Sequence, residues 1–297
     1  MSSGDWTIGV DVGGSNLRAA RVGRDGALDD RRSERISRDP DAAVSRIRDL
    51  CRDLGSSPVA GIGIGIPGRV DGRRRRVLSG GYIDFAASRL VERIEDAVGV
   101  PVSIDNDCNM ALVAEMAVGA ARGARDVVMF TIGTGIGGAV ALDGVVTRGA
   151  GTAGQLGHLT VEADGPPCNC GRRGCVETLS SGSALGRRVA EAGFSPETRL
   201  DDLEAAAARG DARAEAVLSG WIAPLRSAID SMVAAVCPDL VLLGGGLGAA
   251  AAAALVRAPA ASPWYQCAVR AALLGDEAGV IGAGLAAGGR TGGDGRR

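Results

Sequence analysis

Residues 6–16, Trp-Thr-Ile-Gly-Val-Asp-Val-Gly-Gly-Ser-Asn, decide the fold. The first seven predict a buried strand, and the next four predict a glycine turn that returns the chain into a second strand. The pattern recurs at 127–138, where an apolar strand runs into Gly-Thr-Gly-Ile-Gly-Gly and a returning strand follows. Two halves that open alike predict a duplicated α/β fold with a cleft between the halves.

Strands and helices alternate through the rest of the chain. Residue spacing and turn residues predict a strand at 28–36, a helix over 43–54, a strand at 59–66, a helix at 88–97, a strand at 100–105, a helix at 107–118, mostly helix from 182 to 236, and a strand at 240–243. We expect a smaller N-terminal α/β domain over 1–109 with the apolar segment 280–290 packing back on it, a larger α/β domain over 110–279, and a disordered tail at 291–297.

Composition limits the possible functions. The 297 residues are 46% hydrophobic and 23% charged with a net charge of −2, which indicates neither a nucleic-acid partner nor an anionic membrane surface. No apolar run reaches the ~20 residues of a membrane span. The first residues carry no signal-peptide pattern, so we expect a cytoplasmic protein.

The sequence contains no lysine and one histidine. All 33 basic residues are Arg, which excludes the phosphate-loop lysine, the protein-kinase strand lysine and a Schiff-base lysine. Four of them are consecutive, at 73–76, and the lack of interleaved aromatic residues favours a solvated hairpin tip over an anion-binding patch. The one histidine is His158. Seven cysteines without an export signal argue against a disulfide framework.

Three glycine turns follow predicted strands, at 13–16, 133–138 and 244–248. Glycine lets backbone amides approach phosphate oxygens, and the hydroxyls of Ser15 and Thr134 can donate to the same oxygens. One such turn is better explained by tight-turn geometry, but three of them in a chain without lysine favour a nucleotide site. The residues expected to bind ATP are Asp11, Gly13, Gly14, Ser15, Asn16, Thr134, Gly135, Gly137, Gly245 and Gly246. Asp11 is placed to orient a hydrated Mg²⁺, or else is a turn-forming residue.

The segment from His158 to Cys175 carries the strongest local signal. His158, Cys168, Cys170 and Cys175 supply one imidazole and three thiolates, a sufficient set for a closed tetrahedral zinc site. A closed site leaves no position for a catalytic water, so the predicted zinc is structural. The alternative, three cysteines without a metal, fits poorly with the glycine-rich spacing.

If zinc occupies His158, the catalytic base must be a carboxylate. Ile104-Asp105-Asn106-Asp107 lies where a strand ends and a helix begins. A carboxylate there can accept the proton of an attacking hydroxyl, and the helix N-terminus favours its charge. Asp107 and Asp105 are both candidates, and either could be a simple N-cap.

Five motifs resemble those of the ROK family (repressors, open reading frames, kinases). They are Asp-x-Gly-Gly-Ser-Asn at 11–16, Gly-Ile-Pro-Gly-Arg-Val-Asp at 65–71, Asn-Asp-x-Asn at 106–109, Gly-Thr-Gly-Ile-Gly-Gly at 133–138, and Gly-x-Ala-Gly-x-x-Gly-His with Cys-x-Cys-Gly-x-x-Gly-Cys-x-Glu within 151–177. The resemblance covers essentially the whole chain in the family's order, and the His–Cys segment is highly specific.

The resemblance implies a two-domain actin- and hexokinase-like (ribonuclease H-like) fold, with ATP and its Mg²⁺ in the interdomain cleft. It also implies structural Zn²⁺ on the His–Cys set, Asp107 as the base, and a homodimer or homotetramer. The residues expected at the sugar are Asn106, Asp107, Gln155, His158, Glu177, Asp84 and Gly68. His158 can ligate zinc with one ring nitrogen and address the sugar with the other.

Two departures from the family pattern concern the sugar. Gln155 stands where the family usually has Glu, and Asp84 adds an acid to the loop where the family usually has Asn-Leu-x-x-Trp. Gln keeps an acceptor but loses the charge. These changes are either drift within a glucokinase or a pocket for an amino sugar, whose ammonium group would pair with Asp84; kanosamine is the most attractive such substrate.

The leading hypothesis is therefore an ATP-dependent hexose 6-kinase. The alternatives are a plain glucokinase or N-acetylhexosamine kinase, a catalytically inactive sugar sensor, and a repressor, which would carry a helix-turn-helix domain ahead of the first strand. The sequence leaves open whether polyphosphate replaces ATP and whether Arg89 or Arg148 neutralises the transferred phosphate.

Overall fold

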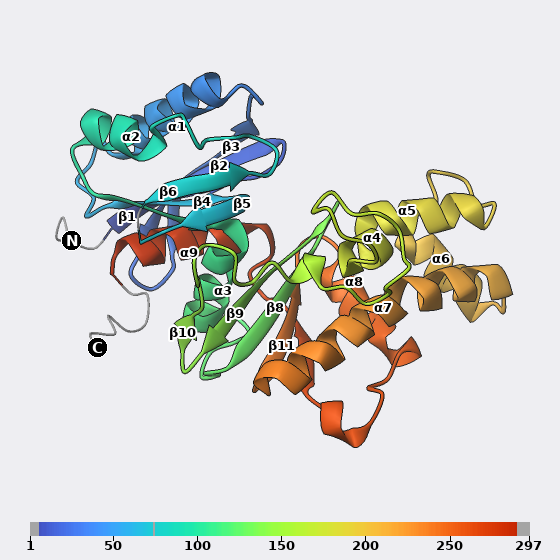
Figure 1. The fold of residues 1–297 in the computed structure, drawn as a ribbon. Coiled ribbons are helices and arrows are strands. Elements are labelled where there is room, and N and C mark those ends of the chain that lie inside the picture. Colours follow the sequence, from blue (N-terminus) through green and yellow to red (C-terminus); the bar gives the residue numbers. More distant parts are fainter. Residues whose placement is uncertain (1–5, 74, 290–297) are drawn as a thin grey trace. The chain divides into compact units, whose positions relative to one another are not determined.

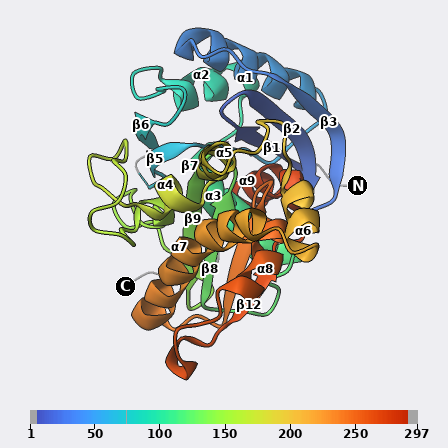
Figure 2. The same cartoon turned by 90° about the vertical axis from the view of Figure 1, so that its right-hand side faces the viewer.

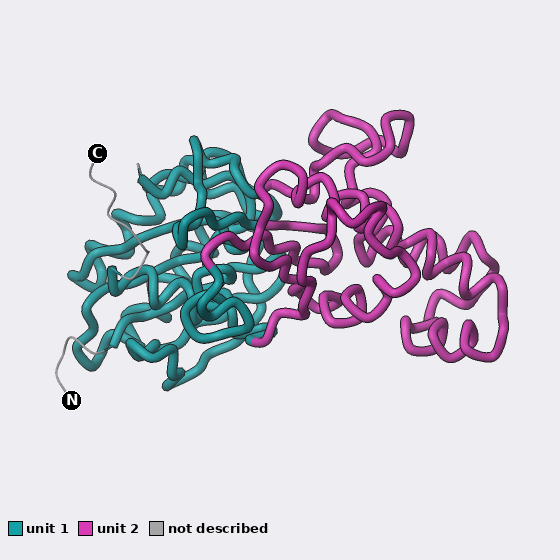
Figure 3. Tube along the Cα trace, turned by 90° about the horizontal axis from the view of Figure 1, so that it is seen from below, with its two compact units in different colours: residues 1–124, 139–154, 274–297 teal, residues 125–138, 155–273 magenta. Residues whose placement is uncertain are grey.

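The computed structural model describes residues 6–73 and 75–289, which form two compact units (Figure 3). Unit 1 contains the residues up to 124, then 139–154 and those from 274 onward; unit 2 contains 125–138 and 155–273. The chain passes from one unit to the other four times, so neither unit is a single stretch of sequence. The domain limits predicted at 109 and 279 stay predictions, and the tail predicted at 291–297 lies outside the described residues.

Unit 1 is built around one five-stranded sheet in the order β3-β2-β1-β4-β7 (Figure 1). Its elements are β1 (Trp6–Val12), β2 (Asn16–Gly23), β3 (Leu28–Arg35), α1 (Pro40–Leu54), β4 (Ile62–Ile66), β5 (Gly68–Asp71), β6 (Arg76–Gly80), α2 (Leu90–Val98), β7 (Val102–Asn106), α3 (Asp107–Val118), β10 (Val145–Val146), η4 (Gly275–Glu277) and α9 (Ala278–Ala287). β9 (Ile136–Leu142) begins in unit 2 and ends in unit 1.

Helices cover both faces of this sheet. α1 and α2 lie over one face, and α3 and α9 lie over the other (Figure 1). The alternation along β1 explains the two layers, because Ile8, Val10 and Val12 belong to the fully buried core shared with α1, whereas Gly9 faces α9.

The backbone of α9 lies so close to β1 and β4 that a side chain on the facing strand residues would not fit. A Cβ on Gly9 would be 2.0 Å from the carbonyl oxygen of Val280, and a Cβ on Gly63 would be 1.8 Å from that of Ala283. Such distances are far inside van der Waals contact, so only glycine fits at either position. α9 is thus seated in a groove that β1 and β4 leave open.

Unit 2 combines three parallel strands with most of the helices. Its elements are β8 (Val127–Ile132), η1 (Leu156–His158), α4 (Val176–Ser180), α5 (Gly182–Glu191), α6 (Leu200–Ala208), α7 (Ala212–Val236), β11 (Leu240–Gly244), α8 (Gly248–Ala254), η2 (Leu255–Arg257), η3 (Pro263–Tyr265) and β12 (Ala268–Ala271). β11 pairs in parallel with β8 on one side and β12 on the other. Figure 2 shows α8 packed beside these strands.

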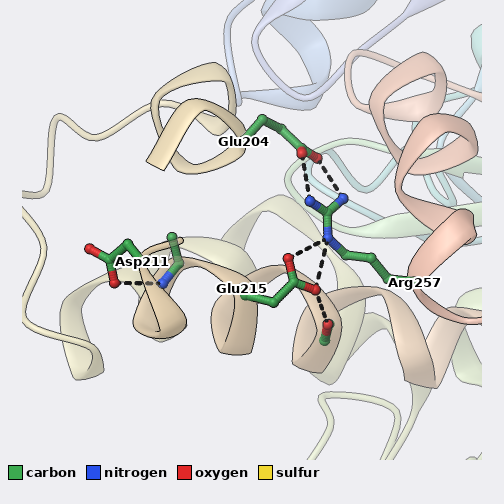
Figure 4. A network of polar contacts seen from close by, with 6 residues as sticks. Glu204, Asp211, Glu215 and Arg257 are labelled. Atoms are coloured by element: carbon green, nitrogen blue, oxygen red, sulfur yellow. Dashed lines mark hydrogen bonds and ion pairs between the residues drawn. The ribbon is translucent and has the colours of Figure 1, made fainter. Parts of the chain in front are cut away.

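A single arginine joins α6 and α7. Arg257 donates two hydrogen bonds to Glu204 at 2.8 and 3.1 Å, and its Nε–H is shared between the two oxygens of Glu215 at 3.0 and 3.1 Å (Figure 4). Asp211 caps α7 by accepting from the amides of its first turn. The planar guanidinium can serve both carboxylates at once because it presents its donors as a fork.

Several predicted elements coincide with observed ones. The strands predicted at 6–12 and 127–132 and the helix predicted at 107–118 have those bounds. Of the arginine run, Arg73 and Arg75 lie between β5 and β6, in agreement with the predicted hairpin tip, and Arg75 pairs with Glu95. β12 was not predicted. Among the described residues, no helix combines the length and apolarity that crossing a membrane requires.

Candidate active site

Three parallel strands of unit 1 bring their carboxyl ends to one edge of the sheet. In register, Asp11 of β1 lies beside Gly65 of β4, and Gly65 lies beside Asp105 of β7. Ligands of open α/β sheets bind at this edge. The first glycine turn and the N-terminus of α3 follow directly, so the predicted phosphate and base residues of unit 1 are brought together.

Asp11 lies in a crowded, charged position on this edge. Its Oδ2 is 3.6 Å from Arg18 NH1, and Arg18 also donates to Asp276 at 2.9 Å. Burial and the nearby Asp107 raise the pKa of Asp11 to about 7, against the opposing effect of Arg18. The Asp11 carboxyl is therefore poised to change charge near neutral pH, and a cation beside it would favour the ionised form.

Asn106 and Asp107 form the start of α3. Asn106 is the N-cap: its Oδ1 accepts from the amides of Cys108 and Asn109 at 2.9 and 3.3 Å, and its Nδ2 donates to the carbonyl of Gly68 at 3.0 Å. Asp107 is the first helical residue and is half-buried. Burial raises its pKa, although a hydrogen bond from the Cys108 amide partly offsets that effect.

Asp105, in contrast to Asp107, is buried with both carboxylate oxygens in hydrogen bonds. It is 3% exposed, its Oδ2 accepts from Arg148 Nε at 2.5 Å, and its Oδ1 accepts from the Asn106 amide and Asn109 Nδ2 at 2.7 and 2.9 Å. A carboxylate with both oxygens engaged is poorly suited to take a proton, which favours Asp107 of the two candidate bases. Arg148 is committed to this ion pair, whereas Arg89 is exposed at the start of α2.

The loop after β6 lies near the same residues of unit 1. The Tyr82 ring packs on Gly14, where a Cβ would be 2.8 Å from the ring. Gly68 has φ +112°, and its neighbour across the hairpin is Gly80. Asp84 is exposed, and its Oδ1 accepts from the amide of Ala86 at 3.1 Å, which leaves its other oxygen for a ligand.

In unit 2 the second and third glycine turns lie side by side. β8 and β11 are parallel and in register through Thr131 and Gly244. The Leu247 amide donates to the carbonyl of Ile132 at 2.9 Å. Gly245 has φ +77° and packs against the backbone of the same residue. The predicted phosphate residues of unit 2 therefore gather at the carboxyl edge of its strands, as those of unit 1 do.

The four predicted zinc ligands form one cluster in unit 2. Their candidate ligand atoms all lie within 4.8 Å of one another. His158 Nδ1 is 3.5 Å from Cys168 Sγ, and Cys170 Sγ is 3.5 Å from Cys175 Sγ. Atoms bound about 2.0 to 2.3 Å from a tetrahedral centre are separated by roughly 3.3 to 3.8 Å, so the spacing and the soft donors both fit Zn²⁺.

Local turns bring these ligands together. The Cys168 amide donates to the carbonyl of Arg172 at 2.8 Å, which folds the segment back on itself. A hydrogen bond from the Arg172 amide lowers the pKa of Cys170 to about 7, so a thiolate forms readily there. His158 ends the short helix η1, whose N-cap is Gln155. Nδ1 faces the sulfur atoms, which leaves Nε2 on the other side of the ring.

Two charged residues near the unit 1 edge, Arg18 and Asp276, were not predicted. Arg18 pairs with Asp11 across the β1–β2 hairpin. The sequence does contain a signal for it, because a four-residue turn at 13–16 places residues 12 and 17 opposite each other, and therefore 11 opposite 18. Asp276 comes from the far end of the chain, and no local pattern links it to this pair.

Glycine turns at strand ends, a candidate base at a helix start and a Cys₃His cluster are the features that the ROK-like motifs of the sequence predict. The chain belongs to the ROK family, whose pattern matches residues 7–288. It is 32% identical to a glucokinase from Halalkalibacterium halodurans over 94% of each chain, and 33% identical to an N-acetylmannosamine kinase from Citrobacter koseri over 95% of this chain and 98% of the other.

A solved structure agrees with the family assignment. The ROK glucokinase of Streptomyces griseus, in complex with glucose and AMPPNP, superposes with a TM-score of 0.79 at 29% identity, covering 95% of this chain and 99% of that one. The predicted actin- and hexokinase-like α/β fold and the predicted ATP-dependent sugar kinase class are thereby confirmed.

Proposed function

We propose that the chain transfers the γ-phosphoryl group of ATP to the 6-hydroxyl of a glucose-like hexose, with Asp107 as the base. The observation that carries this proposal is the state of Asp107: a half-buried carboxyl with a raised pKa, at a helix start and close to Asp11. A base whose pKa is moved toward the working pH is suited to take the proton of a hydroxyl.

In the proposed reaction Asp107 accepts the proton of the 6-hydroxyl as its oxygen attacks the γ-phosphorus. The bond from that phosphorus to the bridging oxygen breaks, and ADP leaves. Phosphoryl transfer depends mainly on positioning and charge stabilisation, so a site without lysine is chemically adequate. Mg²⁺ that arrives with ATP would neutralise phosphate charge, and Asp11 would orient its water.

The nucleotide is assigned to the three glycine turns. Their backbone amides, with the hydroxyls of Ser15 and Thr134, supply donors for phosphate oxygens. The remaining proposed ATP residues are Gly13, Gly14, Asn16, Gly135, Gly137, Gly245 and Gly246. The location of all three turns at the carboxyl ends of parallel strands supports this assignment.

The residues proposed to bind the sugar are Gly68, Asp84, Asn106, Asp107, Gln155, His158 and Glu177. The Nε2 side of the His158 ring, opposite the sulfur cluster, supports a polar contact of that kind. Zn²⁺ on His158, Cys168, Cys170 and Cys175 would stabilise the fold around this ring without taking part in the reaction.

The particular sugar depends on Asp84 and Gln155. The relatives named glucokinase and N-acetylmannosamine kinase fit a glucose-like hexose or an N-acetyl sugar. The free oxygen of the exposed Asp84 carboxylate favours an amino sugar such as kanosamine as a second candidate, because an ammonium group could pair with it. If the pairing is correct, Asp84→Asn lowers the preference for kanosamine over glucose.

The deciding experiment is an ADP-release assay with glucose, mannose, N-acetylmannosamine, N-acetylglucosamine and kanosamine. We expect Mg²⁺-dependent ADP release with at least one of them. Silence with every sugar would favour the inactive sensor. Zinc measured by elemental analysis should be one equivalent, and Cys168→Ser should lose it. We also infer a homodimer or homotetramer in the cytoplasm, testable by light scattering and cell fractionation.

A further inference from the structure

Glu177 has a contact that its proposed role at the sugar does not explain. It is the second residue of α4, two positions after Cys175. Its Oε2 accepts from the amide of Ile136 at 2.8 Å, inside the second glycine turn. Ile136 is only 5% exposed, so this amide has little access to water. A buried amide that loses its acceptor costs free energy, so the bond constrains the turn.

The carboxylate also fits closely against the neighbouring glycine. A Cβ on Gly135 would lie 2.4 Å from Glu177 Oε2, so the two residues occupy adjoining space. One oxygen of Glu177 is thus committed to the turn, and Oε1 is the oxygen that remains for a sugar hydroxyl.

The chain that follows Glu177 supports the same turn along its length. The Gly182 amide donates to the carbonyl of Gly133 at 2.8 Å, and the Ser183 amide donates to that of Thr134 at 3.3 Å. Trp221 restrains the segment that follows Glu177, because its buried Nε1 donates to the carbonyl of Ser181 at 3.1 Å. Main-chain bonds hold the turn at 133 and 134, and the Glu177 side chain holds it at 136.

We propose that Glu177 is a positioning residue for the ATP phosphates: its carboxylate holds the 133–138 turn in the conformation that presents backbone amides to the nucleotide. The proposal rests on the assignment of this turn to ATP made above. A glycine-rich turn has many accessible conformations, and fixing it in one of them costs conformational entropy. A side chain that restricts the turn before binding removes part of that cost, so nucleotide affinity depends on Glu177 even when no sugar is present.

The test is the affinity for Mg·ADP, measured by calorimetry without sugar. A hydrogen bond to a charged acceptor contributes about 1.5–3 kcal/mol, so Glu177→Ala should weaken binding roughly ten- to hundred-fold. Glu177→Asp keeps the charge but withdraws the acceptor by one methylene, and it should weaken binding similarly. Glu177→Gln keeps an acceptor oxygen at the same reach and should stay within about three-fold of the unsubstituted protein.

Glu162→Ala is the matched control, because Glu162 is an exposed carboxylate of the same His–Cys segment. Zinc content should be unchanged in Glu177→Asp and Glu177→Gln, the unfolding midpoint should be unchanged in Glu177→Gln, and exchange of the Ile136 amide should be faster only in the Ala and Asp variants.

Unchanged Mg·ADP affinity in Glu177→Ala and Glu177→Asp would overturn the inference and leave the proposed function intact, since Glu177 would then serve the sugar alone. An equal loss in Glu162→Ala would also overturn it. If the unsubstituted protein bound no Mg·ADP, the proposed function itself would fall, and the inference with it.

Discussion

At the scale of single residues, two carboxyl groups at one sheet edge of unit 1 have raised pKa values. Burial is the main cause for both Asp11 and Asp107, and for Asp11 the neighbouring Asp107 adds to it. Arg18 acts in the opposite direction on Asp11. The surroundings of the two acids differ: Asp11 has a cationic partner, and Asp107 lies at the start of a helix.

Replacing Asp107 tests the proposed base. Asp107→Asn should lower kcat about 10²- to 10⁴-fold, because general-base catalysis contributes that much, while Mg·ADP still binds. In the unsubstituted enzyme kcat should fall as the pH drops through the raised pKa of Asp107, at higher pH than an ordinary aspartate would give, since only the ionised form accepts a proton. Asp53→Asn, at an exposed position of α1, is the control. A variant with normal turnover would exclude Asp107 as the base.

Replacing Asp11 tests the effect of its pKa on stability. Above about pH 3.8 the unfolded chain ionises Asp11, whereas the folded chain retains the proton up to about pH 7. Folding is therefore disfavoured progressively across that window as pH rises. The difference in the free energy of unfolding between Asp11→Asn and the unsubstituted protein should therefore shift in favour of the variant as pH rises. Between pH 4 and pH 8 this shift should be roughly 1–3 kcal/mol. Urea unfolding without nucleotide measures this, and a pH-independent difference would contradict it.

At the scale of elements, the sequence predicts best where patterns are local. The strand-turn-strand repeat predicts β1–β2 and β8–β9 because apolar runs and glycine turns act over a few residues. β12 is missed because four residues, half of them exposed, carry no such pattern. For the base, the sequence narrows the choice to Asp105 and Asp107, but the ion pair with Arg148 comes from a segment 43 residues away, and only the folded chain distinguishes the two.

The Arg257 network offers a prediction about helix packing. Arg257→Gln should lower the free energy of unfolding by about 1–2 kcal/mol, because it removes two paired contacts that join α6 and α7 at a partly exposed position. Arg257→Lys keeps the positive charge but lacks the planar guanidinium, so it should retain only part of the stability that Arg257→Gln loses. Arg209→Gln, at an exposed site after α6, is the control for loss of charge. Equal stability of all three variants would show that the network contributes nothing.

At the scale of the whole molecule, the His–Cys cluster belongs to unit 2 alone. Chelation of zinc should therefore raise hydrogen exchange around 156–183 and in the 133–138 turn, while β1, β4 and β7 of unit 1 keep their protection. The measurement is exchange mass spectrometry before and after chelator, with zinc added back to restore protection. A uniform rise throughout both units would contradict this.

The groove that receives α9 also affects how the protein is made. Gly9 and Gly63 shape that groove near the start of the chain, but the helix that fills it ends at residue 287. At 5–20 residues per second, a ribosome needs roughly 10 to 45 s to travel from the end of β4 to the end of α9. During that interval the part of the sheet face that α9 covers stays exposed, although α3 already packs on the same face. β1 and β4 are thus completed only once α9 has been made, and until then the growing chain presents an exposed groove that a chaperone can bind.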